Sequence, residues 1–476
     1  MTTAFLSKPL FVDLDGTLIR TDLLVESFIG LLKRYPLLAL QVPFWLLRGK
    51  AYLKHRIAEL IAPNPEALPY HTGFLDYLKA QRAAGRPLYL ATASNSRYAE
   101  AVAAHLGIFE GVLASDHNRN LSGHSKLDAI RERCPEGFVY AGNDRVDEPI
   151  WASAKAAVLV NAPTAVAARV SASKPVEAEF AAAPAGLKPW LKAIRPHQWL
   201  KNLLVFLPLL PIATTASPAM VGMALLAFVA FSLCASSVYL LNDLSDLEAD
   251  RAHPRKRKRP FASGSLPALH GLLLAPLLLA SAFALTLWMP WQFAAVLGTY
   301  WVSTTAYTFL LKRYALIDVI TLAGLYTLRV LGGAAAILVM PSFWILAFSM
   351  FIFFSLALAK RYAELHAMRE LDRAGARGRG YQVADLLTVQ LMGVASGYLA
   401  VLVMALYLNS PEILDRYQHV QLLWGVCPLL MLWVSRIWLK SARGEMTDDP
   451  LVFAMRDRMS RYVLGASVGV ILAALL

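Results

Sequence analysis

The chain contains 476 residues, of which 57% are hydrophobic, and it carries a formal net charge of +13. This apolar content exceeds that of an average soluble domain, and three cysteines without metal-type spacing argue against a disulfide framework. Because the basic residues cluster beside apolar segments, the charge indicates a membrane protein with no nucleic-acid partner. The N-terminal residues lead directly into a strand, and no signal peptide is expected.

The N-terminal region begins with an apolar strand at 10–12, which leads into the sequence Asp13-Leu14-Asp15-Gly16-Thr17. Two carboxylates at i and i+2 after a strand point the same way, at the carboxyl edge of an expected parallel sheet. In that position Asp13 suits a nucleophile and Asp15 suits an acid or base, with Mg²⁺ offsetting their repulsion.

Later segments end in polar residues that suit the same site. A strand at 87–91 is followed by Thr92 and Ser94, whose hydroxyls can donate to a phosphate oxygen. Lys126 lies in a loop, where it can neutralise phosphoryl charge. A strand at 137–141 is followed by further oxygen ligands for the metal, namely Asn143, Asp144 and Asp147.

These four segments, in this order, resemble the haloacid dehalogenase superfamily of phosphatases over about residues 8–160. The resemblance implies that Asp13 is the nucleophile forming an aspartyl-phosphate and that Asp15 is the general acid and base. It also implies that Thr92 and Lys126 bind phosphate. The fourth motif departs from the family pattern, because it opens with Asn143 where Asp is usual. The alternative is a degenerate domain with a structural role.

The expected fold of this region is therefore an α/β, Rossmannoid domain of the haloacid dehalogenase type at 1–165. A helical cap is expected at about 22–85, and a linker at 166–194. Within the cap, residues 36–47 form an apolar run that is too short to cross a bilayer and is broken by Pro43. We interpret this run as the cap's interior; the alternative is an amphipathic surface that rests on the membrane.

From residue 195 to 476 the sequence predicts an all-α membrane domain with nine transmembrane helices. The predicted spans are 202–216, 219–240, 267–288, 291–311, 317–339, 342–360, 385–408, 419–438 and 460–476. With a cytoplasmic N-terminal domain, basic residues concentrate in the cytoplasmic loops. The positive-inside rule therefore predicts an integral protein of a bacterial-type cytoplasmic membrane, with both active sites on the cytoplasmic side.

The second predicted span ends in a run of acidic residues. Asn242, Asp246 and Asp250, at i, i+4 and i+8, share one face of a helix, and Asp243 lies beside them. Carboxylates on one stripe repel each other near a membrane, and Mg²⁺ bound to a diphosphate would remove that cost. The next loop adds five cations close behind this run: Arg255, Lys256, Arg257, Lys258 and Arg259. Arg255, Lys256 and Arg259 are predicted to bind the diphosphate, and the alternative is a cluster that only sets the membrane orientation.

Other polar residues converge on the same membrane side and are predicted to bind substrate. Arg329 lies inside the fifth span, where an ionisable side chain is a functional candidate. For Glu364, a surface salt bridge with Lys360 is an equally weighted alternative. The whole set is Arg195, Lys201, Asn202, Tyr307, Lys312, Asp318, Arg329, Lys360, Arg361 and Glu364.

The motif NDxxDxxxD at a helix end resembles the UbiA superfamily of intramembrane prenyltransferases, over about residues 190–476. The second acidic motif of that superfamily is missing, since the stretch YTFLLKRYALIDVI holds one Asp and two cations. Together, RPHQWLKN, NDLSDLEADRAHPRKRKRP, YTFLLK…LID and AKRYAEL resemble the decaprenyl-phosphate phosphoribosyltransferases. This resemblance implies 5-phosphoribosyl 1-diphosphate as donor and polyprenyl phosphate, a membrane lipid, as acceptor. Lys312, Arg313 and Arg329 would replace the second acidic motif.

The expected reaction is the transfer of 5-phosphoribose to the lipid phosphate, followed by removal of the 5-phosphate by the soluble domain. The residues expected to hold Mg²⁺ on the diphosphate are Asn242, Asp243, Asp246 and Asp250. Two alternatives stay open here: an aromatic prenyltransferase of the same fold, and a lipid transporter with a regulatory soluble domain. A phosphatase merely anchored by its spans would leave the acidic run unexplained. The sequence also leaves association into oligomers open.

Overall fold

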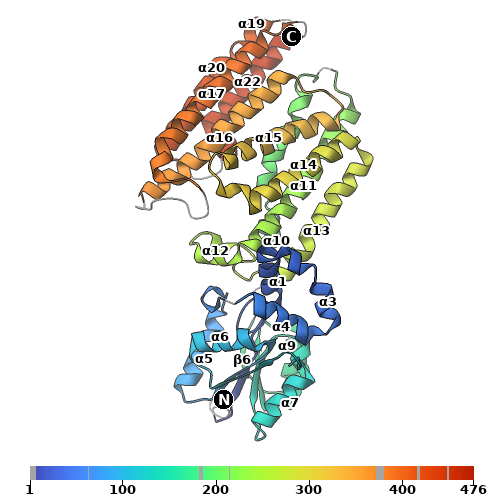
Figure 1. The fold of residues 1–476 in the computed structure, drawn as a ribbon, viewed down its shortest axis with the longest axis vertical. Coiled ribbons are helices and arrows are strands. Elements are labelled where there is room, and N and C mark those ends of the chain that lie inside the picture. The colour runs from blue at the N-terminus through green and yellow to red at the C-terminus, as the bar shows by residue number, and fades with distance from the viewer. Residues whose placement is uncertain are drawn as a thin grey trace. The chain divides into compact units, whose positions relative to one another are not determined.

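The computed structural model describes residues 7–62, 64–181, 186–213, 215–370, 380–414, 417, 419–446 and 450–475 (Figure 1). It divides into two units, which are described here one at a time. The first unit comprises Met1–Ile194 together with Tyr239–Ala275, and the second comprises Arg195–Val238 together with Pro276–Leu476. The segment that holds the acidic run therefore belongs to the first unit.

A six-stranded sheet forms the centre of the first unit, with the strand order β3-β2-β1-β4-β5-β6. Every neighbouring pair is parallel. The order reverses between β1 and β4, and such a switch point leaves a crevice at the carboxyl ends of the strands where α/β proteins bind ligands. The strands are β1 (Leu10–Val12), β2 (Leu88–Asn95), β3 (Gly111–Ser115), β4 (Val139–Gly142), β5 (Ala156–Val160) and β6 (Val176–Phe180).

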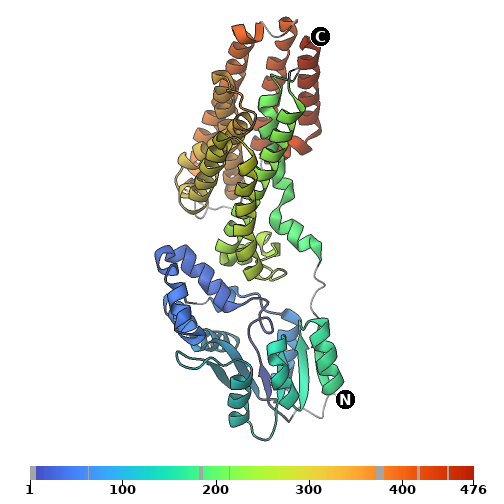
Figure 2. The same cartoon turned by 90° about the vertical axis from the view of Figure 1, so that its right-hand side faces the viewer.

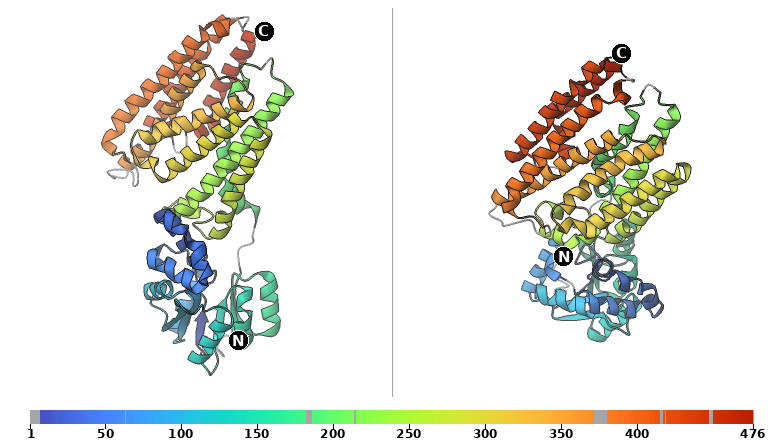
Figure 3. Two further views of the ribbon diagram at one scale, coloured as in Figure 1. Left: turned by 45° about the vertical axis from the view of Figure 1, so that its right-hand side comes forward. Right: turned by 45° about the horizontal axis from the view of Figure 1, so that its top comes forward.

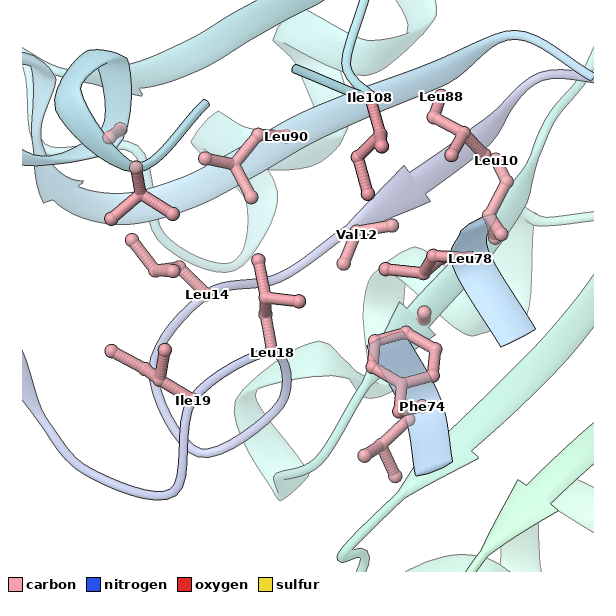
Figure 4. Close-up of a cluster of buried hydrophobic side chains, with 14 of the residues drawn as sticks. Leu10, Val12, Leu14, Leu18, Ile19, Phe74, Leu78, Leu88, Leu90 and Ile108 are labelled. Atoms are coloured by element: carbon pink, nitrogen blue, oxygen red, sulfur yellow. The ribbon is translucent and has the colours of Figure 1, made fainter. Parts of the chain in front are cut away.

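Alternating side chains of β1 enter two separate cores, one on each face of the sheet. Leu10 and Val12 pack with Phe74 from helix α5 (Thr72–Ala83), as Figure 4 shows. Phe11 points to the opposite face, where it joins the cluster of Trp151 from α8 (Glu148–Ser153). Helices therefore cover both faces, which explains why the central strand β1 and its neighbour-but-one β5 are apolar throughout.

The predicted helical cap corresponds to four helices between β1 and β2, whereas α5 packs on the sheet and belongs to the α/β layers. The cap helices are α1 (Leu23–Arg34), α2 (Pro36–Ala39), α3 (Val42–Leu47) and α4 (Lys50–Leu60). The remaining helices of this unit are α6 (Ser96–Leu106), α7 (His124–Arg133), α9 (Thr164–Ser173), α10 (Leu187–Ile194) and α12 (Leu247–Ala252).

The sheet extends to Phe180, where the sequence predicted a linker. Helix α9 and strand β6 occupy much of the interval 166–194, and β6 pairs with β5. A buried ion pair fixes the added strand, because Nη1 of Arg86 lies 2.5 Å from Oε1 of Glu177. The weakly patterned, Ala-rich sequence of this interval concealed both elements.

The second unit consists of helices that pack side by side (Figures 2 and 3). Six helices in the described part of the chain are long and apolar enough to cross a membrane: Pro218–Ser245 (α11), Ala268–Trp288, Ile317–Ala336 (α15), Phe343–Glu370 (α16), Val383–Leu408 and Val420–Ala442. Their α-helical cores include α13 (Ala268–Leu285), α17 (Leu386–Leu408) and α20 (Val426–Ala442). Helix α11 ends in the first unit, and helix α13 begins there.

Three of the nine predicted spans are not confirmed. Residues Pro196–Leu209 form a 3₁₀-helix, η3, that contains Pro208. Proline lacks the backbone N–H that an α-helix needs, which accounts for the departure at 202–216. Helices α14 (Trp291–Phe309) and α22 (Arg458–Leu475) do form, but neither is among the six candidate spans.

Candidate active sites

Four buried side chains meet near the carboxyl ends of β1 and β4. They are Asp13, Lys126, Tyr140 and Asp147. Lys126 lies in the first turn of α7 and not in the predicted loop, and its Nζ donates to Oδ1 of Asp13 at 2.7 Å and to the Tyr140 hydroxyl at 3.0 Å. Tyr140 donates to Oδ1 of Asp147 at 2.7 Å. Burial raises the pKa of Asp13 to about 6, although the Lys126 ammonium lowers it. Burial lowers the pKa of Lys126, but the two carboxylates outweigh it and the net shift is upward, so Lys126 stays charged.

Asp15 lies in the turn after Asp13, in a setting that suits proton transfer. Its carboxylate accepts hydrogen bonds from the Leu23 backbone N–H at 2.9 Å and from Oγ of Ser94 at 2.5 Å. Burial raises the pKa of Asp15 to about 7, and the charge of Asp22 adds to the rise. A group that titrates near neutral pH can both donate and accept a proton during turnover.

The end of β2 supplies hydroxyls and is approached by a cation from the cap. Thr92 is fully buried, and its Oγ1 accepts from the Ser94 backbone N–H at 3.0 Å. Lys54 of α4 donates from Nζ to the Ala93 carbonyl at 2.6 Å and to Oδ1 of Asn120 at 2.8 Å. Burial lowers the pKa of Lys54. The sequence prediction missed Lys54, because nothing local marks a cap lysine as a neighbour of this strand.

The three residues of the fourth motif have different environments. Asn143 lies against the first motif, where its Oδ1 accepts from Oγ1 of Thr17 at 3.2 Å. Oδ2 of Asp147 accepts from the backbone N–H groups of Asn143 and Asp144, at 3.1 and 3.3 Å. Asp144 is exposed and caps the Arg145 N–H at 2.6 Å. Asp144 and Asp147 therefore shape the loop, and Asn143 remains beside the first motif.

The oxygen atoms at this edge fit a magnesium ion that keeps several water ligands. Among the described residues, no three histidine, cysteine, aspartate or glutamate side chains gather closely enough to hold a metal on their own. The Asp13 carboxylate and the Asn143 amide oxygen are the hard ligands that Mg²⁺ prefers. This donor set carries one negative charge fewer than a pair of aspartates would.

The acidic run near the end of α11 is broken, not continuous. Helix α11 ends at Ser245, and Asp246, with φ of −108° and ψ of 17°, separates it from α12. Asp243 and Asp250 are both buried, and Nη1 of Arg259 donates to them at 3.0 and 2.6 Å. The structure therefore brings Asp243 and Asp250 together around one guanidinium. It does not form the single stripe that the sequence predicted.

These two carboxylates also fit magnesium. Buried carboxylates that share a cation can exchange it for Mg²⁺, provided that water and phosphate oxygens complete the octahedron. The half-buried side chain of Arg259 would then be available to an anionic leaving group. Arg255 and Lys256 are exposed in the same loop, and the half-buried Asn242 accepts the Asp246 N–H through its backbone carbonyl at 3.1 Å.

Two contacts join this segment to the cap within the first unit. Nζ of Lys33, near the end of α1, donates to the Ser245 carbonyl at 2.6 Å and to Oδ1 of Asp246 at 3.4 Å. Nη1 of Arg251 donates to Oε2 of Glu26 at 2.9 Å, and both side chains are largely buried. The segment after α11 is thus held against α1.

In the second unit, Asp318 and Arg361 connect α15 with α16. Nε of Arg361 donates to Oδ2 of Asp318 at 2.5 Å, and the Tyr381 hydroxyl donates to Oδ1 at 2.7 Å. Arg361 also donates to the Tyr307 hydroxyl at 3.0 Å and to Glu364 at 2.6 Å. Four sequence-predicted residues therefore meet here, and Tyr381 is an addition that only the fold reveals.

Arg329 is buried in the second unit, where its guanidinium lies over the aromatic rings of Tyr300 and Tyr326. Its Nε donates to Oδ1 of Asn202 at 2.8 Å, and Nη2 donates to the Tyr300 hydroxyl at 2.9 Å. The guanidinium carbon lies 4.8 Å from the ring centre of Tyr300 and 5.3 Å from that of Tyr326. The Lys201 ammonium also approaches the Tyr326 ring, at 5.8 Å. Arg329 thus ties α15 to α14 and η3.

The remaining predicted residues are partly exposed. Arg195 has a left-handed backbone conformation, with φ of 58°, immediately before η3. Lys312 belongs to the short 3₁₀-helix Leu311–Arg313, and Lys360 lies on α16. All three side chains are half-buried.

Residues 203–455 match the UbiA prenyltransferase family, which is more than half of the chain. The chain belongs to the UbiA prenyltransferase family. Residues 10–148 match the haloacid dehalogenase-like hydrolases. This UbiA-family enzyme is therefore an integral membrane protein with a hydrolase-like domain in front.

Two relatives illustrate the range of this family. An uncharacterized protein of Sinorhizobium fredii, y4nM, is 38% identical over 96% of this chain and 89% of its own length. The decaprenyl-phosphate phosphoribosyltransferase of Mycolicibacterium smegmatis is 31% identical over 60% of this chain and 92% of its own length. A solved UbiA homolog from Archaeoglobus fulgidus, bound to GPP and Mg²⁺, is 15% identical with a TM-score of 0.46 and covers 60% of this chain and 99% of its own.

Proposed function

We propose that this UbiA-family enzyme transfers 5-phosphoribose from 5-phosphoribosyl 1-diphosphate to a polyprenyl phosphate, and that its front domain then removes the 5-phosphate. The observation that carries the proposal is the 31% identity to a decaprenyl-phosphate phosphoribosyltransferase over 92% of that enzyme. The order of domains supports the second step, because a phosphatase-type site precedes the transferase on one chain.

The surroundings of the acidic residues support a diphosphate leaving group. Mg²⁺ held by Asp243 and Asp250 would neutralise the departing diphosphate. Arg259 reaches both carboxylates, so its guanidinium can bind a diphosphate oxygen at the same place. The exposed Arg255 and Lys256 add positive charge in the same loop as Arg259.

The residues after the fourth predicted span support an anionic acceptor. The one carboxylate there, Asp318, already binds Arg361 and Tyr381. An enzyme that binds two diphosphate-type groups through metals would need more acidic residues in this position. Lys312, on the 3₁₀-helix Leu311–Arg313, and Lys360, on α16, are half-buried and suit a lipid phosphate.

The transfer step forms one bond and breaks one. An oxygen of the lipid phosphate attacks C1 of the ribose, and the bond from C1 to the diphosphate oxygen breaks. Diphosphate leaves with the bonding electron pair, and no further reactant is consumed. Because the charge that develops lies on the diphosphate, positioning and electrostatic stabilisation account for the rate.

The second step uses the cluster at the edge of the sheet. A carboxylate oxygen of Asp13 attacks the phosphorus of the 5-phosphate, and Asp15 gives its proton to the leaving 5-hydroxyl oxygen. Water then attacks the aspartyl-phosphate, Asp15 takes a proton back, and inorganic phosphate leaves. Lys126, 2.7 Å from Asp13, offsets the phosphoryl charge in both halves. Both sites would lie on the cytoplasmic side, where the basic loops are expected.

The transferase is tested with membranes that contain the enzyme, labelled 5-phosphoribosyl 1-diphosphate and polyprenyl phosphate. A labelled lipid should form, and Asp250→Asn should abolish it. A product formed instead from a prenyl diphosphate and an aromatic acceptor would replace this proposal with ordinary prenylation.

The phosphatase step is tested by product analysis. In Asp13→Asn the lipid that still carries the 5-phosphate should accumulate, while total transfer stays unchanged. Asp144→Asn is the matched control, because this exposed carboxylate only caps the loop. An unchanged product in Asp13→Asn would refute the second step and leave the first intact.

A further inference from the structure

The cap carries an unusually apolar exposed surface. It is formed by the consecutive short helices α2 and α3, and we call it the cap patch. The exposed fractions of its four main side chains are 80% for Leu37, 71% for Leu40, 68% for Phe44 and 84% for Leu47. Large apolar side chains gathered at this exposure mark a surface that binds protein or lipid.

The opposite side of the same helices is buried, so the exposure does not result from a poorly packed segment. Ala39 and Trp45 point inward, where they join a cluster with Leu31, Leu53 and Ile57 from α1 and α4. The cap patch is therefore one face of an amphipathic unit, and its leucines and phenylalanine are not needed for the cap's own core.

Positive charge surrounds the cap patch, without any acidic residue nearby in the sequence. Lys33 and Arg34 precede it, Arg48 and Lys50 follow it, and all four side chains are exposed. No Asp or Glu occurs between Glu26 and Glu59. An apolar face flanked by Lys and Arg is the pattern of segments that lie in the interface of an anionic membrane.

An independent contact places the start of this segment at the end of a membrane span. Nζ of Lys33, three residues before Pro36, lies 2.6 Å from the carbonyl oxygen of Ser245, the last residue of α11. The ion pair of Glu26 with Arg251 holds α1 to the segment just beyond that span. Either end of a candidate span lies near a membrane surface, so this contact favours a bilayer as the partner of α2 and α3.

We propose that the cap patch docks on the lipid bilayer, with Leu37, Leu40, Phe44 and Leu47 among the acyl chains and the flanking cations on anionic headgroups. The docking would hold the opening of the phosphatase site at the depth where a lipid-linked sugar phosphate emerges. This consequence rests on the proposed function, whereas the docking itself does not.

Spin labels on the full-length enzyme test the docking. Leu40→Cys and Phe44→Cys are each labelled in a Cys134→Ser background, since Cys234 and Cys427 are buried. Glu132→Cys, exposed on α7, is the matched control. In vesicles of phosphatidylcholine and phosphatidylglycerol, the labels at 40 and 44 should be accessible to oxygen and protected from a water-soluble nickel chelate. The control label should show the reverse.

Equal nickel access at all three positions would overturn the docking. Dipolar broadening between labels on different chains, without protection by lipid, would overturn it too, because the cap patch would then be an interface between two copies. In the parent, the labels at 40 and 44 should be better protected from nickel when the vesicles contain phosphatidylglycerol than in phosphatidylcholine alone. Arg34→Gln with Arg48→Gln should remove this difference in protection. An unchanged difference would contradict the role given to the flanking cations.

A second experiment tests the consequence for catalysis. Leu40→Glu with Phe44→Glu should slow dephosphorylation of the lipid product by roughly tenfold, because two charges oppose burial in the membrane. Hydrolysis of para-nitrophenyl phosphate by the same variant should stay within about twofold of the parent, since neither residue touches the site. Equal loss on both substrates would refute the positioning role. Absence of any phosphatase activity in the parent would instead refute the second step of the proposed function and leave the docking standing.

Discussion

Arg259 and Asp250 form a hydrogen bond of 2.6 Å beside the end of α11, and the same nitrogen of Arg259 also reaches Asp243. The two carboxylates are buried, whereas the arginine side chain is 24% exposed. One cation thus compensates two buried anions and keeps access to solvent. Mg²⁺ could therefore take the place of the guanidinium between the two carboxylates. The guanidinium of Arg259 would then be available to bind a substrate anion.

Arg259→Gln should therefore reduce the transferase kcat by roughly a hundredfold, the usual effect of losing one donor to developing negative charge. Arg257→Gln is the matched control, because Arg257 is exposed in the same loop and should change kcat by less than about twofold. Initial rates with saturating donor measure both. A parent-like rate in Arg259→Gln would remove this residue from the site.

The second prediction concerns Asn143 and the Mg²⁺ requirement of the phosphatase. Asn143→Asp adds a carboxylate next to Thr17 and should lower the Mg²⁺ concentration for half-maximal activity by roughly tenfold, because charge strengthens an oxygen ligand. Asp144→Asn should leave both the metal requirement and the stability nearly unchanged, since an asparagine amide oxygen caps the Arg145 N–H about as well as a carboxylate. Titrating Mg²⁺ into the chelated enzyme measures the metal requirement of both variants. A changed requirement in Asp144→Asn alone would mean that Asp144, and not Asn143, holds the metal.

The sequence predicted those parts of the fold whose signals are local. The apolar strand before Asp13 and the turn at Gly16 are examples. Gly16 has φ of +75°, and a Cβ there would lie 2.2 Å from the Asn143 amide nitrogen. A short apolar strand followed by a carboxylate and a glycine can be recognised without any knowledge of distant segments.

Features that depend on distant partners could not be predicted. Strand β6 exists because it pairs with β5 and because Glu177 meets Arg86, 91 residues away in sequence. The Tyr381 hydroxyl reaches Asp318 across 63 residues. The break at Asp246 was missed for a different reason, since the i, i+4 spacing on both sides assumes an uninterrupted helix.

The buried pair of Glu26 and Arg251 gives a third prediction, on stability. Glu26→Gln leaves an arginine that is 8% exposed without its countercharge, and should lower the free energy of unfolding by about 3 kcal/mol. The double variant Glu26→Arg with Arg251→Glu should recover part of this loss. A double-mutant cycle of thermal unfolding in detergent, made of each single swap and the double swap, measures the coupling, with Arg169→Gln as an exposed control on α9. Additive losses would mean that the two side chains do not interact.

The last prediction decides whether Asp318 binds substrate or holds the bundle together. Both of its carboxylate oxygens accept hydrogen bonds, from Arg361 and Tyr381, and the residue is fully buried. Asp318→Asn should therefore destabilise the enzyme by about 3 kcal/mol, because Arg361 loses its buried partner. Tyr381→Phe removes two hydrogen bonds, the one donated to Asp318 and the one accepted from the Leu316 backbone N–H, and should cost about 2 kcal/mol.

Thermal unfolding in detergent, measured beside the KM for each substrate, distinguishes the two roles of Asp318. A structural role predicts that stability falls in Asp318→Asn and, to a smaller extent, in Tyr381→Phe, with little change in either KM. A substrate ligand predicts the opposite pattern, with parent-like unfolding and a raised KM in Asp318→Asn alone. The hydrogen bond from Tyr381 favours the structural role, because it fixes the carboxylate in place before any substrate arrives.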